Sequence, residues 1–387
     1  MRIAYIGDFI NHGKSLQTIG TAVVILLSLL KDVDSIDVFC PEENKKTEKF
    51  ELPKKVNLYK FYRYDNSVSV LRLLKIHWHN YDAVIFNMLP TGFGDRTLPN
   101  AFALIIPIIS RIIFRKRNIK VIYHNSIFTN DIRKLGYNSA LDRIRSFFLW
   151  IVERTLFKNV VTFVLLDLYR KKIDDTIGKN KVRVLNGRYL EAITTLYINK
   201  GMDSELVETE KTDISTVLMH GFWGPQKNIE LGLMALRELK REGEKFRLVI
   251  SGGINHHFPE YKRKFQDLIH SYSDVIDEYL GPVSEKDIMK IFLEASLVVL
   301  PYNTPGGHSG VLEQAIFFEV PTIAIDFSEF REQMEGINFV KLIKSEYSLK
   351  LISKNLLQSN TIKNIEIDVK EKIKEAVNNI RELINDS

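Results

Sequence analysis

The chain has 387 residues, 45% of them hydrophobic and 26% charged, which is the composition of a folded globular protein of about two domains and excludes a disordered chain. Its single cysteine, Cys40, excludes an intrachain disulfide and a cysteine zinc site and is typical of a reducing compartment. The net charge of +6 favours small anionic ligands or an acidic membrane surface, and the sequence lacks the arginine-rich strips with interleaved aromatic residues that would indicate nucleic-acid binding.

The first half of the chain alternates between strand-like and helix-like segments. Residues 2–6 predict a strand that ends at Gly7-Asp8, and residues 20–30 predict a helix after it. Further strand-like runs follow at residues 36–39, 82–86, 121–123, 160–165 and 182–185. Strands that alternate with helices in this way predict a parallel, doubly wound sheet.

A second alternating run begins near residue 216 and predicts a second α/β domain. Its strands are expected at residues 216–219, 247–251, 278–280 and 297–300, with a helix at 228–241. Residues 191–213 are polar with weak periodicity, and residues 368–384 form an amphipathic pattern. We therefore expect an N-terminal domain over residues 1–190, an interdomain connection over 191–213, a C-terminal domain over 214–365, and a segment over 366–387 whose helix returns to the N-terminal domain.

A glycine-rich loop follows the apolar run 297–300 and precedes a predicted helix over 311–318. Three glycines allow its backbone to approach a ligand closely: Gly306, Gly307 and Gly310. The amides of Gly310, Val311 and Leu312 would be the unpaired N-terminal donors of that helix, which attract phosphate. Glu313 would lie in the first turn, within reach of a ligand hydroxyl. The alternative is an ordinary loop of an α/β protein.

The order of these signals resembles the retaining glycosyltransferases of the GT-B fold, in particular glycosyltransferase family four. The matching fragments are Gly221–Asn228, Ser251-Gly252-Gly253, Leu280–Asp287 and Glu319–Thr322 in the second half, and His124 and Asn186-Gly187 in the first half. The resemblance implies two tandem Rossmann-like domains with an interdomain cleft, and a nucleotide-sugar donor bound by the C-terminal domain.

The resemblance also assigns roles to particular residues. Lys227 would neutralise the departing diphosphate, His124 would lie beside the transferred sugar, and Glu313 would contact the ribose. The donor-binding set would be Gly221, Gly252, Gly307, His308, Ser309, Gly310, Val311, Leu312 and Glu313, and the acceptor or diphosphate side would include Gly13, Lys14 and Gly20. The alternatives are a solvated lysine, a histidine at a strand end and a first-turn glutamate that stabilises a helix dipole.

The chain departs from the family pattern at two charged positions. Phe222 stands where the family has an arginine, and Pro305 stands where it has the first glutamate of a paired motif. A phosphate site without its arginine loses a charge-assisted hydrogen bond worth about 1.5–3 kcal/mol unless another cation replaces it. The candidate replacements are His308, Lys14 and His220.

The function implied is retaining transfer of a sugar, in particular a hexose, from a nucleotide-diphosphate donor to a hydroxyl of a glycan or lipid-linked acceptor. The expected mechanism uses no metal and no cofactor beyond the donor itself, because the departing diphosphate oxygen assists the incoming hydroxyl and positive groups stabilise the charge. One alternative is a catalytically degenerate partner subunit of the same fold. A second alternative is a GT-B nucleotide-sugar epimerase.

Two apolar segments with basic neighbours indicate peripheral membrane contact. Residues 101–120 are apolar and then abruptly basic, and residues 151–157 contain Arg154 and follow Arg143 and Arg145. The alternative is buried helices with solvated basic ends. The N-terminal run lacks the long apolar core of a signal peptide. We therefore expect a cytoplasmic protein that contacts the inner face of the membrane.

Overall fold

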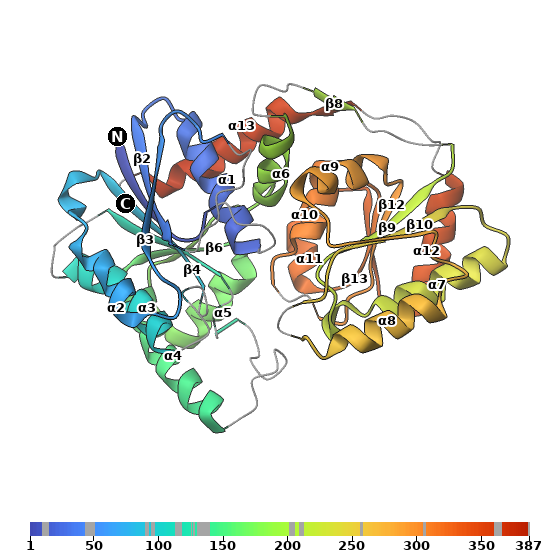
Figure 1. Ribbon diagram of the computed structural model, residues 1–387, viewed down its shortest axis with the longest axis horizontal. Coiled ribbons are helices and arrows are strands. Elements are labelled where there is room, and N and C mark those ends of the chain that lie inside the picture. Colours follow the sequence, from blue (N-terminus) through green and yellow to red (C-terminus); the bar gives the residue numbers. More distant parts are fainter. Residues whose placement is uncertain are drawn as a thin grey trace. The chain divides into compact units, whose positions relative to one another are not determined.

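The chain forms two compact units, Met1–Leu190 with Ile373–Ser387 and Glu191–Lys372 (Figure 1). The computed structural model describes residues 1–9, 15–42, 51–89, 93, 97–112, 118–124, 126, 128–129, 140–200, 206–208, 213–255, 258–304, 307–359 and 366–385. Each unit is built around its own parallel sheet and its own apolar core.

The sheet of the first unit has the order β3-β2-β1-β4-β5-β6-β7, and all of its described pairings are parallel. Its strands are β1 (Arg2–Ile6), β2 (Ser35–Pro41), β3 (Val56–Tyr62), β4 (Ala83–Met88), β5 (Ile119–Tyr123), β6 (Val161–Val164) and β7 (Val182–Val184). The strand order reverses between β1 and β4, which is the point where open α/β sheets bind ligands at the carboxyl ends of their strands.

Helices lie between these strands along the chain. They are α1 (Ser15–Leu29), α2 (Ser67–Leu71), α3 (Thr97–Ile112), α4 (Ala140–Asn159) and α5 (Asp167–Ile177), with two short 3-10 helices, η1 (Arg72–Lys75) and η2 (Trp78–Asn80). The apolar segment that starts at residue 101 lies within α3. Its Ala103, Leu104 and Ile106 are buried in the core of the first unit. For this helix the structure agrees with the buried alternative.

The C-terminal segment α13 (Val369–Ile380) and η5 (Arg381–Leu383) ends in the first unit. Lys120 of β5 is buried, and its ammonium donates hydrogen bonds to the carbonyl oxygens of Glu382 and Asn385. A lysine interacts favourably with the carbonyl groups at the end of a helix. This lysine therefore ties the end of the described chain to the first sheet.

The second unit repeats the same topology, with the strand order β11-β10-β9-β12-β13-β14. These strands are β9 (Thr216–His220), β10 (Arg247–Ser251), β11 (Glu278–Gly281), β12 (Leu297–Leu300), β13 (Thr322–Ile325) and β14 (Val340–Ile343). Its helices are α6 (Leu190–Lys200), η4 (Pro225–Lys227), α7 (Ile229–Arg241), α8 (Tyr261–Ser271), α9 (Glu285–Glu294), α10 (Gly310–Phe317), α11 (Ser328–Gln333) and α12 (Glu346–Ser359). A short antiparallel pair joins β8 (Leu206–Glu208) to β15 (Glu366–Asp368).

The predicted fold class, two doubly wound parallel α/β sheets, is confirmed. Among the differences from the sequence prediction, two have a clear physical reason. The segment expected as a connection begins with α6, whose Ala192, Ile193 and Leu196 are buried. Strand β3 was not predicted because it is an edge strand with mostly exposed or half-exposed residues, so it lacks a continuous apolar run.

Candidate functional site

In the second unit, the loops that follow β9 and β12 meet where the strand order reverses. Gly221, directly after β9, has a φ of +145°, and a Cβ there would lie 3.8 Å from Val311 Cγ2, 3.9 Å from Lys227 Cε and 3.9 Å from Tyr302 Oη. These are ordinary contact distances, so the side chains of Val311, Lys227 and Tyr302 all lie against Gly221. We take the space beside Gly221 as the centre of the candidate site.

The neighbouring strand end fixes the backbone of Gly221. Gly252, after β10, has a φ of +105°, and a Cβ there would overlap the carbonyl oxygen of Gly221. Only glycine allows this approach of one loop to the other. The amide of Gly221 also donates a hydrogen bond of 3.2 Å to the carbonyl oxygen of Ser251.

Lys227 is the cation of the site. It ends η4, and the next residue, Asn228, has a left-handed φ of 44° that starts α7. The Lys227 ammonium lies 3.6 Å from the centroid of the Tyr302 ring, and it forms no ion pair within 4 Å among the residues that the structure describes. Burial lowers the pKa of Lys227 to about 7. A desolvated ammonium without an anionic neighbour in contact attracts an anionic ligand.

The start of α10 faces the same site. Ser309 is its N-cap, with its hydroxyl oxygen accepting from the Leu312 amide at 3.3 Å. Gln333 of α11 holds the cap in place, because its side chain accepts from the Ser309 amide at 2.9 Å and donates to the Ser309 carbonyl at 3.3 Å. The amides of Gly310 and Val311 are then first-turn donors without an intrahelical partner, which suit an anion.

Glu313 is buried in the first turn of α10, with 2% of its surface exposed. Its Oε1 accepts hydrogen bonds from the amides of Glu191 at 2.5 Å and Ala192 at 3.4 Å, so it caps the start of α6. Burial raises the pKa of Glu313 well above its ordinary value, and the charge of Glu191 raises it further. Contact of Glu313 with a ribose remains a prediction.

Two histidines near the site do not supply the cation that the family arginine would have provided. Burial lowers the pKa of His308 to about 4, and burial together with the charge of Lys227 lowers the pKa of His220 to about 4. The Nδ1 atom of His220 lies 2.7 Å from Ser251 Oγ. Both rings are therefore neutral near pH 7, which leaves Lys227 as the cation among these described candidates.

The first unit brings two predicted residues to one asparagine. His124 follows β5, and its Nε2 lies 2.7 Å from Asn87 Oδ1 on β4. A Cβ on Gly20 of α1 would lie 2.9 Å from Asn87 Nδ2 and 2.6 Å from Tyr5 Oη. His124 and Gly20 thus lie against the same buried residue near the reversal of strand order.

The remaining residues of interest include both described and undescribed positions. Gly13 and Lys14 lie outside the described residues, as does Pro305. Gly307 is described and has a φ of +105° in the loop before α10. Sequence reasoning missed Tyr302 and Asn87, although a tyrosine just after a buried strand and an amide within an apolar strand were visible signals. It also missed Glu191, because no local sequence pattern marks this residue.

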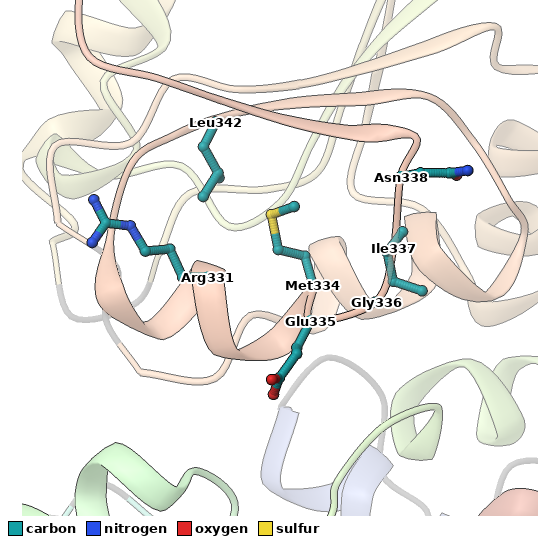
Figure 2. Close-up of a pocket in the computed structure, with 7 residues that line it drawn as sticks. All are labelled: Arg331, Met334, Glu335, Gly336, Ile337, Asn338 and Leu342. Carbon is teal, nitrogen blue, oxygen red and sulfur yellow. The ribbon is translucent and has the colours of Figure 1, made fainter.

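A surface pocket of about 290 Å³ lies elsewhere in the second unit (Figure 2). It is formed by the end of α11 and the chain leading into β14, and Figure 2 shows Met334 and Leu342 pointing toward each other across it. Arg331, at its edge, is paired with Asp326 at 2.6 Å. None of the predicted site residues lines this pocket, so we do not place the donor there.

Two parallel sheets with the same reversed strand order, and an anion-attracting helix start at the reversal of the second, define a protein of the GT-B class. Residues 205–365 match the model of the family described as "Glycosyl transferases group 1". Residues 205–365, which make up most of the second unit, are therefore similar to the group 1 glycosyltransferases. A search of curated protein sequences found no match.

Solved structures with the same fold cover almost the whole chain. Sucrose-phosphate synthase from Thermosynechococcus elongatus has a TM-score of 0.63 at 12% identity, covering 99% of this chain and 95% of that one. Anabaena HepE in complex with UDP-glucose has a TM-score of 0.60 at 13% identity, covering 99% and 94%. WaaG, a glycosyltransferase of lipopolysaccharide biosynthesis, has a TM-score of 0.59 at 12% identity, covering 99% and 95%. At these identities the similarity establishes the fold.

Proposed function

We propose that this chain is a retaining, metal-independent glycosyltransferase that moves a hexose from a nucleotide-diphosphate donor to a hydroxyl of a glycan or lipid-linked acceptor. The observation that carries the proposal is that two side chains lie against Gly221: that of Lys227, and that of Val311 at the start of α10. A desolvated ammonium and the first-turn amides of α10 are then both available to one diphosphate.

In this reaction the bond between the anomeric carbon and the diphosphate oxygen breaks, and a bond from the acceptor oxygen to that carbon forms on the same face. The acceptor proton passes to the departing diphosphate oxygen, so no protein nucleophile is needed. Lys227 and the amides of Gly310 and Val311 stabilise the negative charge that develops on the diphosphate. His124 is proposed to bind the transferred sugar.

The similarity to HepE, whose structure contains UDP-glucose, makes UDP-sugars the first donors to test. We would incubate the protein with a panel of UDP-, GDP- and ADP-sugars and a total lipid extract, and detect products by mass spectrometry. Lys227→Ala should abolish transfer, whereas Lys262→Ala, an exposed lysine on α8, should leave it unchanged. Near-normal transfer by Lys227→Ala would contradict the proposal.

A lipid-linked acceptor is supported by an apolar stripe on α4. Four side chains at helical spacing are exposed by 41–61%: Ile144, Phe147, Phe148 and Ile151. The same helix carries Arg154, stacked on Trp150 at 5.1 Å, and the exposed Lys158. Apolar and basic groups together suit an anionic membrane surface. Among the helices in the described part of the chain, none has the length and apolarity needed to span a bilayer.

We therefore propose a cytoplasmic protein that contacts the inner face of the membrane through α4. Phe148→Asp should reduce flotation with anionic vesicles, while Val68→Asp, which changes an exposed apolar residue on α2, should have no effect. Equal binding of both variants, or binding insensitive to salt, would exclude this surface.

The second candidate function is a catalytically degenerate partner subunit. It is favoured by the neutral state of His220 and His308 and by Phe222, which is 46% exposed at the position of the family arginine. Such a subunit would show no turnover with any donor, even where it binds nucleotide. A nucleotide-sugar epimerase, in contrast, would convert the donor without an acceptor.

A further inference from the structure

The side chain of Glu191 covers the start of α10. Glu191 lies in the first turn of α6 and is 7% exposed. A Cβ built on Gly310, the first residue of α10, would overlap the Glu191 carboxylate. The carboxylate therefore lies directly against the end of α10 where the first-turn amides are found, and a side chain at position 310 would force it to shift.

The same carboxylate acts on the cation of the site. The negative charge of Glu191 raises the pKa of Lys227, against the larger lowering caused by burial. It also raises the pKa of Tyr302, whose ring lies under the Lys227 ammonium. The start of α10 and the Lys227 ammonium, which would both attract a phosphate, thus both attract the Glu191 carboxylate.

Neighbouring buried atoms indicate that the site is built for a polar ligand. The side chains of His308 and Glu313 are 8% and 2% exposed, and His308 Nε2 lies 3.7 Å from Glu313 Oε2. Neither His308 Nδ1 nor Glu313 Oε2 has a hydrogen-bond partner among the described residues. Unsatisfied buried polar atoms are costly, and a ligand with hydroxyl groups would satisfy them.

We infer that the Glu191 carboxylate occupies the position of a donor phosphate at the start of α10 and competes with a nucleoside diphosphate for it. This inference rests on the proposed function. Two anions cannot share one helix start without strong repulsion, so the diphosphate must displace the Glu191 side chain. Because the Glu313 carboxyl accepts a hydrogen bond from the Glu191 amide, displacement of the Glu191 side chain would also affect the start of α6.

The first test measures binding of inorganic pyrophosphate, UDP, GDP and ADP by isothermal titration calorimetry. Glu191→Gln keeps the shape of the side chain and removes its charge, so it should bind pyrophosphate and the preferred nucleotide about fivefold or more tightly than the unaltered chain. The matched control is Glu260→Gln, an exposed glutamate beside α8, which should not change the affinity. Equal affinity of the unaltered chain and Glu191→Gln would overturn the inference.

The same titrations separate this inference from the proposed function. Binding of UDP or pyrophosphate that is indifferent to Glu191→Gln removes the inference alone. Failure of both proteins to bind pyrophosphate, UDP, GDP and ADP removes the proposed function together with the inference. A purely structural role for Glu191 would lower the melting temperature of Glu191→Gln without tightening binding, which also counts against competition.

A second test measures the contact itself, without any ligand. Gly310→Ala should lower the melting temperature clearly in the unaltered chain, because the new methyl group meets the Glu191 carboxylate. In a Glu191→Ala background the same substitution should cost much less, giving a coupling between the two positions. Equal losses in the two backgrounds would show that the carboxylate does not lie at the start of α10 in solution.

Discussion

The two units have the same strand order and yet present different chemistry where that order reverses. In the first unit the described residues predicted there are closely packed, with His124 Nε2 at 2.7 Å from Asn87 Oδ1. In the second unit, Lys227, Glu191 and Glu313 bring one cation and two carboxyl groups together in a desolvated place. One topology thus holds different functional groups at the two reversals of strand order, and the loop residues decide which.

The glycine after the first strand of each unit shows the difference most clearly. Gly7 follows β1 and Gly221 follows β9, with φ values of +153° and +145°. A Cβ on Gly7 would lie 2.8 Å from the carbonyl oxygen of Asn87, whereas a Cβ on Gly221 would meet no atom of the described residues closer than 3.8 Å. A methyl group at the equivalent point would clash with backbone in the first unit, whereas in the second unit it would make ordinary contacts beside Lys227.

The largest effect that would test this comparison is on stability. Gly7→Ala should destabilise the protein by about 2–4 kcal/mol, because it adds a steric clash with backbone to an unfavourable φ. Gly221→Ala should cost only about 1 kcal/mol of stability and should instead weaken UDP binding. Urea unfolding and UDP titration of the two variants would measure both effects. Equal destabilisation would show that the two positions are packed alike.

The next effect concerns pH and the second unit alone. Lys227 has a pKa of about 7, and a bound diphosphate favours its charged form, so binding should take up a proton above pH 7. UDP affinity should therefore be flat below about pH 6 and fall by up to about tenfold per unit of pH above 7. Calorimetry in buffers of different ionisation enthalpy would detect the proton. Lys227→Met should remove the slope, and a slope retained in that variant would assign it to another group.

A smaller effect compares how the residues of the two sites change the free energy of unfolding. The pKa of Lys227 is about 7 in the folded chain and 10.5 as its ordinary value, so the unfolded chain holds an extra proton between these values. The stability of the unaltered protein should then rise with pH across this window. Lys227→Met should stabilise the protein by on the order of 1 kcal/mol at pH 7, with the gain shrinking toward pH 10. Asn87→Ala, in contrast, should destabilise it, since His124 loses its partner. A destabilised Lys227→Met would contradict this account of the site.

The sequence predicted the parallel sheets because their central strands are short apolar runs that stop at glycine or polar residues. It also placed Lys227 and the start of α10 in one site by resemblance, and the structure brings both against Gly221. It could not predict that Glu191 lies against Gly310, since that contact joins residues far apart in the chain and depends on the packing of α6. The helix α6 itself was not recognised because residues 190–196 are all buried, so the sequence shows little helical periodicity.

Two residues with side chains have a backbone conformation that favours glycine. Asn228 and Glu319 both have left-handed φ values, 44° and 54°. Asparagine tolerates this conformation, whereas glutamate is strained in it. Glu319 is paired with Lys372 at 2.8 Å, and this interaction offsets part of the strain. Such a compensation can be seen only in three dimensions.

The tie between Lys120 and the carbonyl groups of Glu382 and Asn385 has a consequence for how the chain is connected. Because the first unit resumes at residue 373, the second unit is an insertion within it, joined by two covalent crossings, at 190–191 and at 372–373. Any rotation of one unit against the other must twist both crossings together. A cut in one crossing should loosen that linkage while the Lys120 contacts keep the C-terminal segment in the first unit.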